Sequence, residues 1–322
     1  MSKRAVAVEE ALVQDKNNTK VNARTNVFKR FLFNQKAAPY VFIVPFIIVF
    51  ILFFISPMVN TVIMSFQKVL PGQRTFIGTN NYTKILGDKV FLKALWNSTK
   101  YMIWTLILLI PIPMILACLI NSKKMIGREF FKSALFLPSL TSVVVAGTVF
   151  RLAFGEESSA LMNQVIGLLG MEPLKWLKGG TTGFIILLVL ACWRWTGVNM
   201  LYFLSGLKNI PDELYESADI DGANAFQKFR YITVPQLKPT TIYVLTISVY
   251  AGLAMFTESY MLWAGNSSPQ NIGLTIVGYL YRQGIEKNAM GYASAVGIVL
   301  FIIAMAINLV QLKFNGMFSK ED

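Results

Sequence analysis

The chain has no histidine among its 322 residues. This absence excludes imidazole acid–base catalysis and histidine-ligated zinc sites. Cysteine is also scarce. Cys118 and Cys192 both lie in apolar runs, where a free cysteine packs as a small hydrophobic side chain, so they offer no disulfide framework. Charged residues make up 15% of the chain, against about 25% in a typical soluble domain, which argues against an ordinary soluble fold.

Two sequence signals are also missing. No G-x-x-x-x-G-K-[ST] motif is present, so the chain lacks the usual backbone cradle and lysine for nucleotide phosphates. If ATP and Mg²⁺ are used, a partner must bind them, and we predict no cofactor and no metal for this chain. The polar, basic residues 1–35 are not followed by a short apolar segment with a small-residue cleavage site, so we expect no cleaved secretory signal.

Long apolar stretches dominate what is present, and hydrophobic residues make up 54% of the chain. A membrane-spanning helix needs about 20 mostly apolar residues, and six stretches reach or approach that length. They are 37–67, 101–122, 133–150, 181–207, 239–264 and 288–312. The pattern predicts an all-α polytopic membrane protein with six transmembrane helices in a 37–314 domain. The apolar piece 272–280 is too short to cross, and we assign it to an external loop that turns back toward the membrane.

The distribution of basic residues predicts the orientation. A net charge of +13 would suggest nucleic acid on a soluble protein, but here it fits loops that face anionic lipid, and we expect no nucleic-acid partner. The basic N-terminal tail and the short 123–132 loop favour the cytoplasm, although the basic 68–93 loop would then lie outside. We therefore predict cytoplasmic tails at 1–36 and 315–322, on a multi-pass protein of the plasma membrane.

The polar segment 210–239, between the fourth and fifth predicted spans, has a strong local pattern. Pro211 and Asp212 favour a helix start, and Asp221-Gly222 is a turn signal that should divide the segment into two short helices. Apolar side chains then recur at helical spacings, and we expect Pro235 and Pro239 to end the second helix. The segment should form a stiff helix–turn–helix bracket in the cytoplasm.

This segment resembles the EAA loop of binding-protein-dependent ABC importer permeases. The match runs through Glu216-Ser217-Ala218, Asp221-Gly222-Ala223, Ile232, Pro235 and Pro239, with Ser217 in place of the usual alanine. The resemblance implies that the EAA-like loop (208–239) docks on an ATP-binding subunit. Glu216 would meet a basic group there, and Gly222 would permit the sharp turn. The implied coupling residues are Glu216, Ser217, Ala218, Asp221, Gly222, Ala223 and Pro235.

Other segments extend the resemblance over most of the chain. FIGTNNYTKIL and ALFLPSLTSVVVAGTVFRLAFG look like the carbohydrate-uptake, maltose-type branch, and KSALFLP, CWRW, YVLTIS and NIGLTIVGYLY look like the arabinose-oligosaccharide permeases of Gram-positive bacteria. The resemblance implies a type I ABC importer permease fold and a transport subunit that is not itself an enzyme. It also implies several partners: a second homologous permease, two ATP-binding subunits that are dedicated or shared, and an extracytoplasmic sugar-binding lipoprotein.

Polar residues inside two predicted spans are candidates for lining a substrate path. Such groups are costly in lipid and usually face a protein interior or a wet cavity. Aromatic faces cover the C–H faces of a sugar, while amide, hydroxyl and guanidinium groups meet its hydroxyls. For Arg194 and Glu258, an ion pair or pairing with backbone carbonyls is an equal alternative. The predicted lining residues are Arg194, Trp195, Asn199, Tyr250, Thr257 and Glu258.

Two other classes of protein remain to be weighed. A secondary transporter or channel without an ATPase should carry intramembrane carboxylates and internal repeats, but Glu258 is the clear candidate carboxylate and we find no repeat. A membrane enzyme would need a catalytic constellation, and we find none. We therefore favour an ATP-driven sugar importer.

Overall fold

The computed structural model describes residues 38–70, 72–122 and 125–314, and helices account for most of them. The predicted tails, 1–36 and 315–322, lie outside the described residues. The chain divides into two compact units, with the boundary between Ile63 and Met64.

The described residues of the first unit form one apolar helix. It comprises α2 (Ala38–Phe50), the π-helical turn η1 (Ile51–Ile55) and α3 (Ser56–Ser65), the last of which runs on into the second unit. The continuous stretch Pro39–Ser65 has 27 residues and is long and apolar enough to cross a membrane. It matches the first predicted span.

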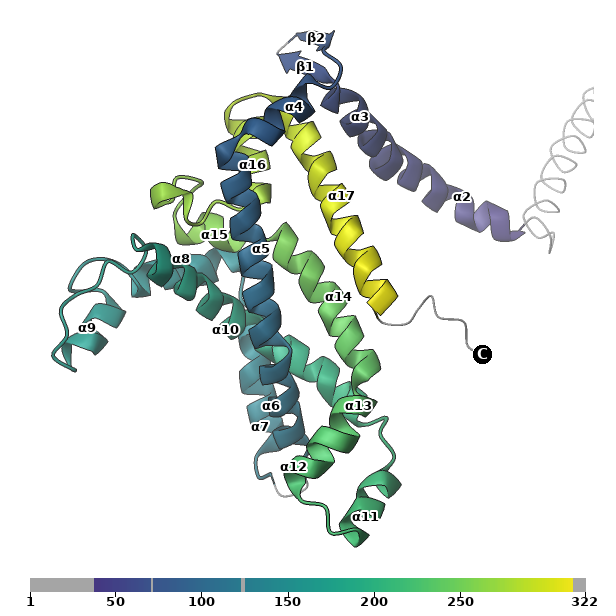
Figure 1. The fold of residues 1–322 in the computed structure, drawn as a ribbon, viewed down its shortest axis with the longest axis vertical. Coiled ribbons are helices and arrows are strands. Elements are labelled where there is room, and N and C mark those ends of the chain that lie inside the picture. Colours follow the sequence, from purple (N-terminus) through teal and green to yellow (C-terminus); the bar gives the residue numbers. More distant parts are fainter. Residues whose placement is uncertain (1–37, 71, 123–124, 315–322) are drawn as a thin grey trace, which may run out of the picture. The chain divides into compact units, whose positions relative to one another are not determined.

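The second unit begins with a β-hairpin and continues as helices (Figure 1). The hairpin pairs β1 (Gln67–Leu70) with β2 (Gln73–Phe76) in antiparallel register. The helices before the long central helix are α4 (Asn80–Gly87), α5 (Lys89–Leu109), α6 (Pro111–Asn121), α7 (Arg128–Phe136), η2 (Leu137–Leu140), α8 (Val143–Ala153) and α9 (Leu161–Gly167). Those that follow are α10 (Gly180–Leu207), α11 (Asp212–Ile220), α12 (Ala225–Lys228), η3 (Phe229–Thr233), α13 (Val234–Gln236), α14 (Lys238–Ala254), α15 (Thr257–Leu262), η4 (Pro269–Asn271), α16 (Ile276–Tyr281), η5 (Arg282–Glu286) and α17 (Met290–Phe314).

The helices confirm an α-helical, polytopic membrane protein, but two of the six predicted spans are broken. Within the described residues, four helices meet the length and apolarity of a span: Pro39–Ser65, Lys89–Asn121, Gly180–Leu207 and Met290–Lys313. The third predicted span is a pair of helical segments bent by 95°, and with it the count reaches five. The bend follows a 3₁₀ turn with Pro138 in its first turn, which interrupts the α-helical hydrogen bonds. The fifth predicted span stops after α14, 17 residues long, and restarts at α15.

Helix α10 lies at the centre of the second unit and packs against α5, α6 and α14. Two glycines permit close approaches between helices of this unit. A Cβ atom on Gly197 would lie 2.0 Å from the carbonyl oxygen of Leu135 on α7. A Cβ atom on Gly252 of α14 would lie 2.9 Å from the Cα atom of Met102 on α5. Any side chain at either glycine would therefore push two helices apart.

Asp88 joins three helices at the end of the unit opposite the EAA-like loop. It caps α5, accepting hydrogen bonds from the backbone N–H groups of Val90 (2.8 Å) and Phe91 (3.2 Å). Its other carboxylate oxygen accepts from the hydroxyl of Tyr279 on α16 and, at 3.1 Å, from that of Tyr292 on α17. The predicted external piece 272–280 is thus buried against protein, since Tyr279 has no exposed surface.

These hydrogen bonds set the protonation behaviour of Asp88. Partial burial by itself raises the pKa of this carboxyl, but the four hydrogen bonds to its charged form outweigh that effect and lower the pKa below its usual value of 3.8. A carboxyl with a lowered pKa stabilises the fold at neutral pH. That contribution is lost as the pH falls from the unfolded value through the lowered folded value.

We predict that Asp88→Ala lowers the thermal stability of the purified protein by about 1–2 kcal/mol, the scale of a lost helix cap. Asp88→Asn is the matched control, because asparagine still caps α5 but carries no charge, and it should lose less. The wild-type unfolding temperature should also fall more steeply below pH 4 than that of Asp88→Asn, as measured in a detergent melting assay. Equal acid sensitivity in the two proteins would contradict this role for Asp88.

Candidate functional site

A cavity of about 240 Å³ lies at the break in the fifth predicted span. Helices α5, α10 and α14 form its walls, and the start of α15 closes one side. Its lining is mixed in character, with aromatic, hydroxyl, amide and carboxylate groups beside aliphatic ones. The polar and aromatic lining residues are Tyr101, Thr105, Trp195, Asn199, Tyr202, Ser248, Phe256, Thr257 and Glu258.

A buried ion pair borders this cavity. Arg194 Nη1 on α10 lies 2.9 Å from Glu258 Oε1 in the first turn of α15, and the two side chains are only 10% and 14% exposed. The Arg194 guanidinium carbon also lies 5.4 Å from the centre of the Trp195 ring, within range of a cation–π contact. Because unpaired charges are very costly inside a membrane protein, this contact ties α10 to α15 across the broken span.

A second polar contact replaces a helix hydrogen bond that is lost at Pro113 in α6. Helix α5 ends at Leu109, whose carbonyl oxygen would normally accept from the N–H of residue 113. Residue 113 is a proline and has no N–H to give. Asn199 Nδ2 on α10 donates to this carbonyl instead, at 2.9 Å, from a position 7% exposed. Asn199 therefore both lines the cavity and replaces a missing helix hydrogen bond.

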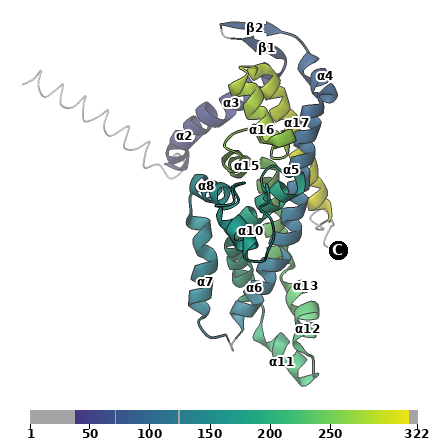
Figure 2. The ribbon, with the colours of Figure 1, turned by 90° about the vertical axis from the view of Figure 1, so that its left-hand side faces the viewer.

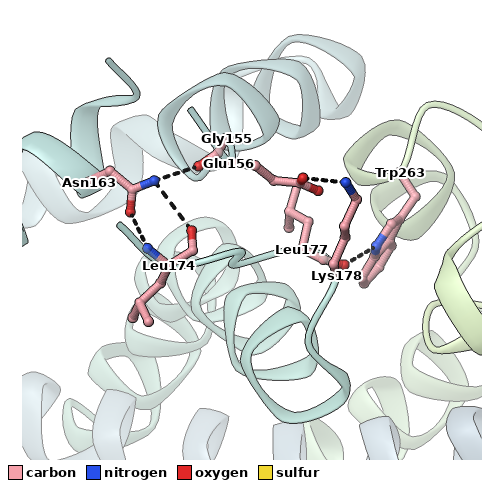
Figure 3. Close-up of polar contacts among 7 residues, drawn as sticks. All are labelled: Gly155, Glu156, Asn163, Leu174, Leu177, Lys178 and Trp263. Atoms are coloured by element: carbon pink, nitrogen blue, oxygen red, sulfur yellow. Dashed lines mark hydrogen bonds and ion pairs between the residues drawn. The ribbon is translucent and has the colours of Figure 1, made fainter. Parts of the chain in front are cut away.

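The loop between α8 and α10 forms an ordered lobe with Asn163 at its centre (Figure 3). Asn163 Nδ2 donates to the carbonyl oxygens of Gly155 (3.2 Å) and Leu174 (3.3 Å), and its Oδ1 accepts from the Leu174 N–H (3.0 Å). Lys178 Nζ lies 2.5 Å from Glu156 Oε2 and closes the lobe beside α10. One buried amide thus binds the irregular backbone on both sides of α9.

The lobe and a second loop hold α15 in position. Trp263 at the end of α15 donates from Nε1 to the carbonyl oxygen of Leu177, 2.9 Å away (Figure 3). Ser259 Oγ donates to the carbonyl oxygen of Gly273, which precedes α16. With the Glu258 ion pair, these contacts fix a six-residue helix from three sides, so the cavity wall that it forms is rigid.

The EAA-like loop contains two helix ends of recognisable type. At the end of α11, the N–H groups of Ala223 and Gly222 donate to the carbonyls of Ala218 (2.8 Å) and Asp219 (3.1 Å). Gly222 has φ of +73°, the left-handed conformation that this Schellman ending requires. Asn224 and Gln227 then form a capping box that starts α12. The predicted division into two helices at Asp221-Gly222 is confirmed.

Side-chain contacts join the two helical parts of this loop. The hydroxyls of Tyr215 on α11 and Thr233 on η3 lie 2.9 Å apart, and Lys228 pairs with Asp219 across the turn. The second helix was predicted to end at Pro235 and Pro239, and it ends between them: helical backbone continues through Pro235 to Gln236, and α14 begins at Lys238. Pro235 follows the π-helical turn η3 and occupies the first turn of α13, where a missing N–H costs little.

Comparisons with known proteins give the family. Residues 109–319 match the family model for the binding-protein-dependent transport system inner membrane component. The chain belongs to this family.

Two relatives are arabinooligosaccharide transport system permease proteins. The protein from Bacillus subtilis (strain 168) is 52% identical over 93% of this chain and 95% of its own length. That from Halalkalibacterium halodurans is 52% identical over 91% of this chain and 92% of its own length. A chain of a bacterial ABC transporter for the acidic polysaccharide alginate shares the fold, with a TM-score of 0.75 at 23% identity over 93% of this chain and 100% of that one. The chain is thus a multi-pass membrane permease subunit with the ABC importer permease fold.

The permease brings five of the six predicted lining residues together. Trp195, Asn199, Thr257 and Glu258 line the cavity, and Arg194 binds Glu258 at its edge. Tyr250 lies elsewhere: it is 71% exposed and borders a separate apolar cavity between α14 and α17. The lining face of α14 includes Ile247, Ser248, Ala251 and Gly252, and Tyr250 projects away from that face.

Sequence reasoning missed the contribution of α5. Tyr101 and Thr105 lie one turn apart on this helix and form the part of the cavity wall that α5 contributes beside α14. They gave no signal, because tyrosine and threonine occur often in spanning helices and neither is charged. The helix break that admits Phe256 to the cavity was also missed, since 239–264 reads as one apolar stretch.

The Arg194–Glu258 pair yields a direct test. Replacing either residue alone with methionine should destabilise the permease by about 3–5 kcal/mol, because the remaining charge is buried without a partner. The double variant Arg194→Met/Glu258→Met should recover most of that loss, as judged by a thermal double-mutant cycle in detergent. Additive losses in the double variant would show that the two charges are not coupled.

Proposed function

We propose that this permease carries arabino-oligosaccharides across the bacterial plasma membrane, driven by ATP hydrolysis on partner subunits. The observation that carries the substrate class is the cavity at the break before α15. Trp195 offers an aromatic face, while Asn199, Thr257 and Glu258 offer hydrogen-bonding groups at the same level. Aromatic faces with amide, hydroxyl and carboxylate groups are suited to a neutral polyhydroxyl ligand.

The charge balance of the cavity favours a neutral sugar over an acidic one. Arg194 is the cation beside the cavity, and Glu258 neutralises it at 2.9 Å. An acidic polysaccharide such as alginate would meet the Glu258 carboxylate without a free positive charge opposite it, and like charges in a poorly solvated site repel. The 52%-identical relatives named for arabinooligosaccharide transport support the narrower choice of sugar.

The EAA-like loop would couple the permease to an ATPase. Its tip exposes the apolar side chains of Ile220 (88%) and Phe226 (73%). A protein docked on the loop would bury both of them. Glu216, Ser217 and Asp221 are exposed on the same bracket, while Ala218 and Ala223 are half-buried at its turn. Because its two helical parts are joined, the EAA-like loop can transmit a movement of the ATPase to α10 and α14, which it connects.

The remaining partners follow from this assignment. A second, homologous permease would complete the translocation path, two ATP-binding subunits would hold ATP and Mg²⁺, and an extracytoplasmic binding lipoprotein would deliver the sugar. Both termini would lie in the cytoplasm, on the same side as the EAA-like loop. The permease would switch between states that contact the ATPase differently, which is the condition for coupling. A secondary transporter is the less favoured alternative, because the cavity carboxylate Glu258 is already paired and is poorly placed to bind a coupling ion.

The test is uptake by the assembled transporter in proteoliposomes, with the binding protein outside and ATP inside. We expect arabino-oligosaccharide uptake to require ATP and to be indifferent to ion gradients. Gly222→Val should reduce uptake at least about tenfold, because a β-branched residue is strongly disfavoured at φ of +73°.

Gly222→Asn is the matched control, since asparagine tolerates the left-handed conformation and a Cβ atom at this position would meet no neighbour within 4 Å. It should retain most of the uptake. Full uptake by Gly222→Val, or uptake driven by an ion gradient without ATP, would contradict the proposal.

A further inference from the structure

Three aromatic rings form a cluster beside the cavity. The ring centre of Phe256 lies 5.2 Å from those of both Tyr260 and Tyr281, and the two tyrosine rings are 5.8 Å apart. Phe256 is the residue before α15, Tyr260 lies one turn into α15, and Tyr281 ends α16. All three side chains are half-buried, so each keeps part of its surface accessible.

The cluster continues the cavity on the side away from the EAA-like loop. Phe256 belongs to both, because it also lines the cavity with Thr257 and Glu258. Helix α14 begins at the EAA-like loop and leads to α15, and α16 lies beyond α15 at that far end (Figures 1 and 2). Tyr260 and Tyr281 are therefore placed where a sugar would arrive before it reaches the cavity.

The cluster is held rigidly but has unused polar groups. Helix α15 is fixed by its contacts with α10, the lobe and the loop before α16. Arg282, next to Tyr281, binds Asn271 Oδ1 at 3.1 Å and the carbonyl oxygen of Asn266. Within the described part of the chain, no hydrogen bond engages the hydroxyl of Tyr260 or Tyr281, so both hydroxyls are available to a ligand.

The size of the cavity indicates which part of a ligand the cluster would contact. At about 240 Å³ it lies below the range of about 300–1,000 Å³ typical of pockets that enclose a drug-sized ligand. The part of the site that this chain forms is therefore too small to enclose a long oligosaccharide, and we place the later sugar units outside it. We propose that Phe256, Tyr260 and Tyr281 form an outer sugar subsite, which stacks on the third or a later unit of a chain whose first two units occupy the cavity. This inference rests on the proposed function and assigns to it a dependence on chain length.

The test compares uptake of short and long arabino-oligosaccharides by the assembled transporter. Tyr260→Leu and Tyr281→Leu keep an apolar side chain but remove the ring. Each should raise the KM for trisaccharides and longer chains about three- to tenfold, the scale of one aromatic stacking contact, and leave the disaccharide KM nearly unchanged. Tyr260→Phe and Tyr281→Phe keep the ring and should stay close to wild type.

Controls separate this inference from the proposed function. Phe130→Leu removes an exposed ring on α7 that packs edge-to-face against Phe131 away from the cavity, and should behave as wild type at every chain length. If the wild-type assembly takes up no arabino-oligosaccharide, the proposed function fails. If it does, and the leucine variants lose uptake equally at all lengths or lose none, the outer subsite is refuted.

If a leucine variant fails to assemble, Tyr281→Trp supplies a second test. The larger ring should lower the KM for long chains and leave the disaccharide KM unchanged. A KM unchanged at every length, or lowered equally for all, would also refute the subsite.

Discussion

The buried contact between Arg194 and Glu258 is the interaction on which the functional region depends. It joins the middle of the central helix α10 to the short helix α15, which also packs against α8. Two buried charges 2.9 Å apart exclude most other arrangements of these segments, because any separation would leave each charge poorly solvated. The broken fifth span, the cavity at the break and the aromatic cluster beyond it all follow from where this pair places α15.

The same contact shapes the chemistry of the cavity. Because Glu258 neutralises Arg194, the polar lining acts through dipoles and hydroxyl groups and not through net charge. Asn199 also has two roles, since the side chain that replaces the hydrogen bond lost at Pro113 lines the cavity as well. Structural and ligand-facing roles are combined in the same few side chains, so substitutions here will change stability and transport together.

Local signals in the sequence predicted some features well. Asp221-Gly222 is a turn signal, and in the structure Gly222 adopts the left-handed conformation of a Schellman ending. Arg194 and Glu258 stand out because charges are rare in apolar stretches, and their pairing was one of the alternatives considered. The roles of these residues in coupling and in sugar binding remain predictions.

Other features depend on three-dimensional packing and could not be predicted. The break after Ala254 lies in a stretch whose composition is that of a straight span. Tyr250 was chosen as a polar aromatic residue inside a predicted span, and that choice does not determine which face of α14 meets the cavity. Tyr101 and Thr105 carry no distinctive pattern and become part of the site only because Gly252 lets α5 and α14 approach closely.

The most direct measurement is the electron cryomicroscopy structure of the assembled transporter, trapped with a non-hydrolysable ATP analogue and an arabino-oligosaccharide. Sugar density should lie between Trp195 and Thr257, within hydrogen-bonding distance of Asn199 or Glu258, with the Arg194–Glu258 pair intact. Density confined to the apolar cavity beside Tyr250, or a sugar bound with Arg194 and Glu258 separated, would contradict the central claim that this ion pair builds the sugar site.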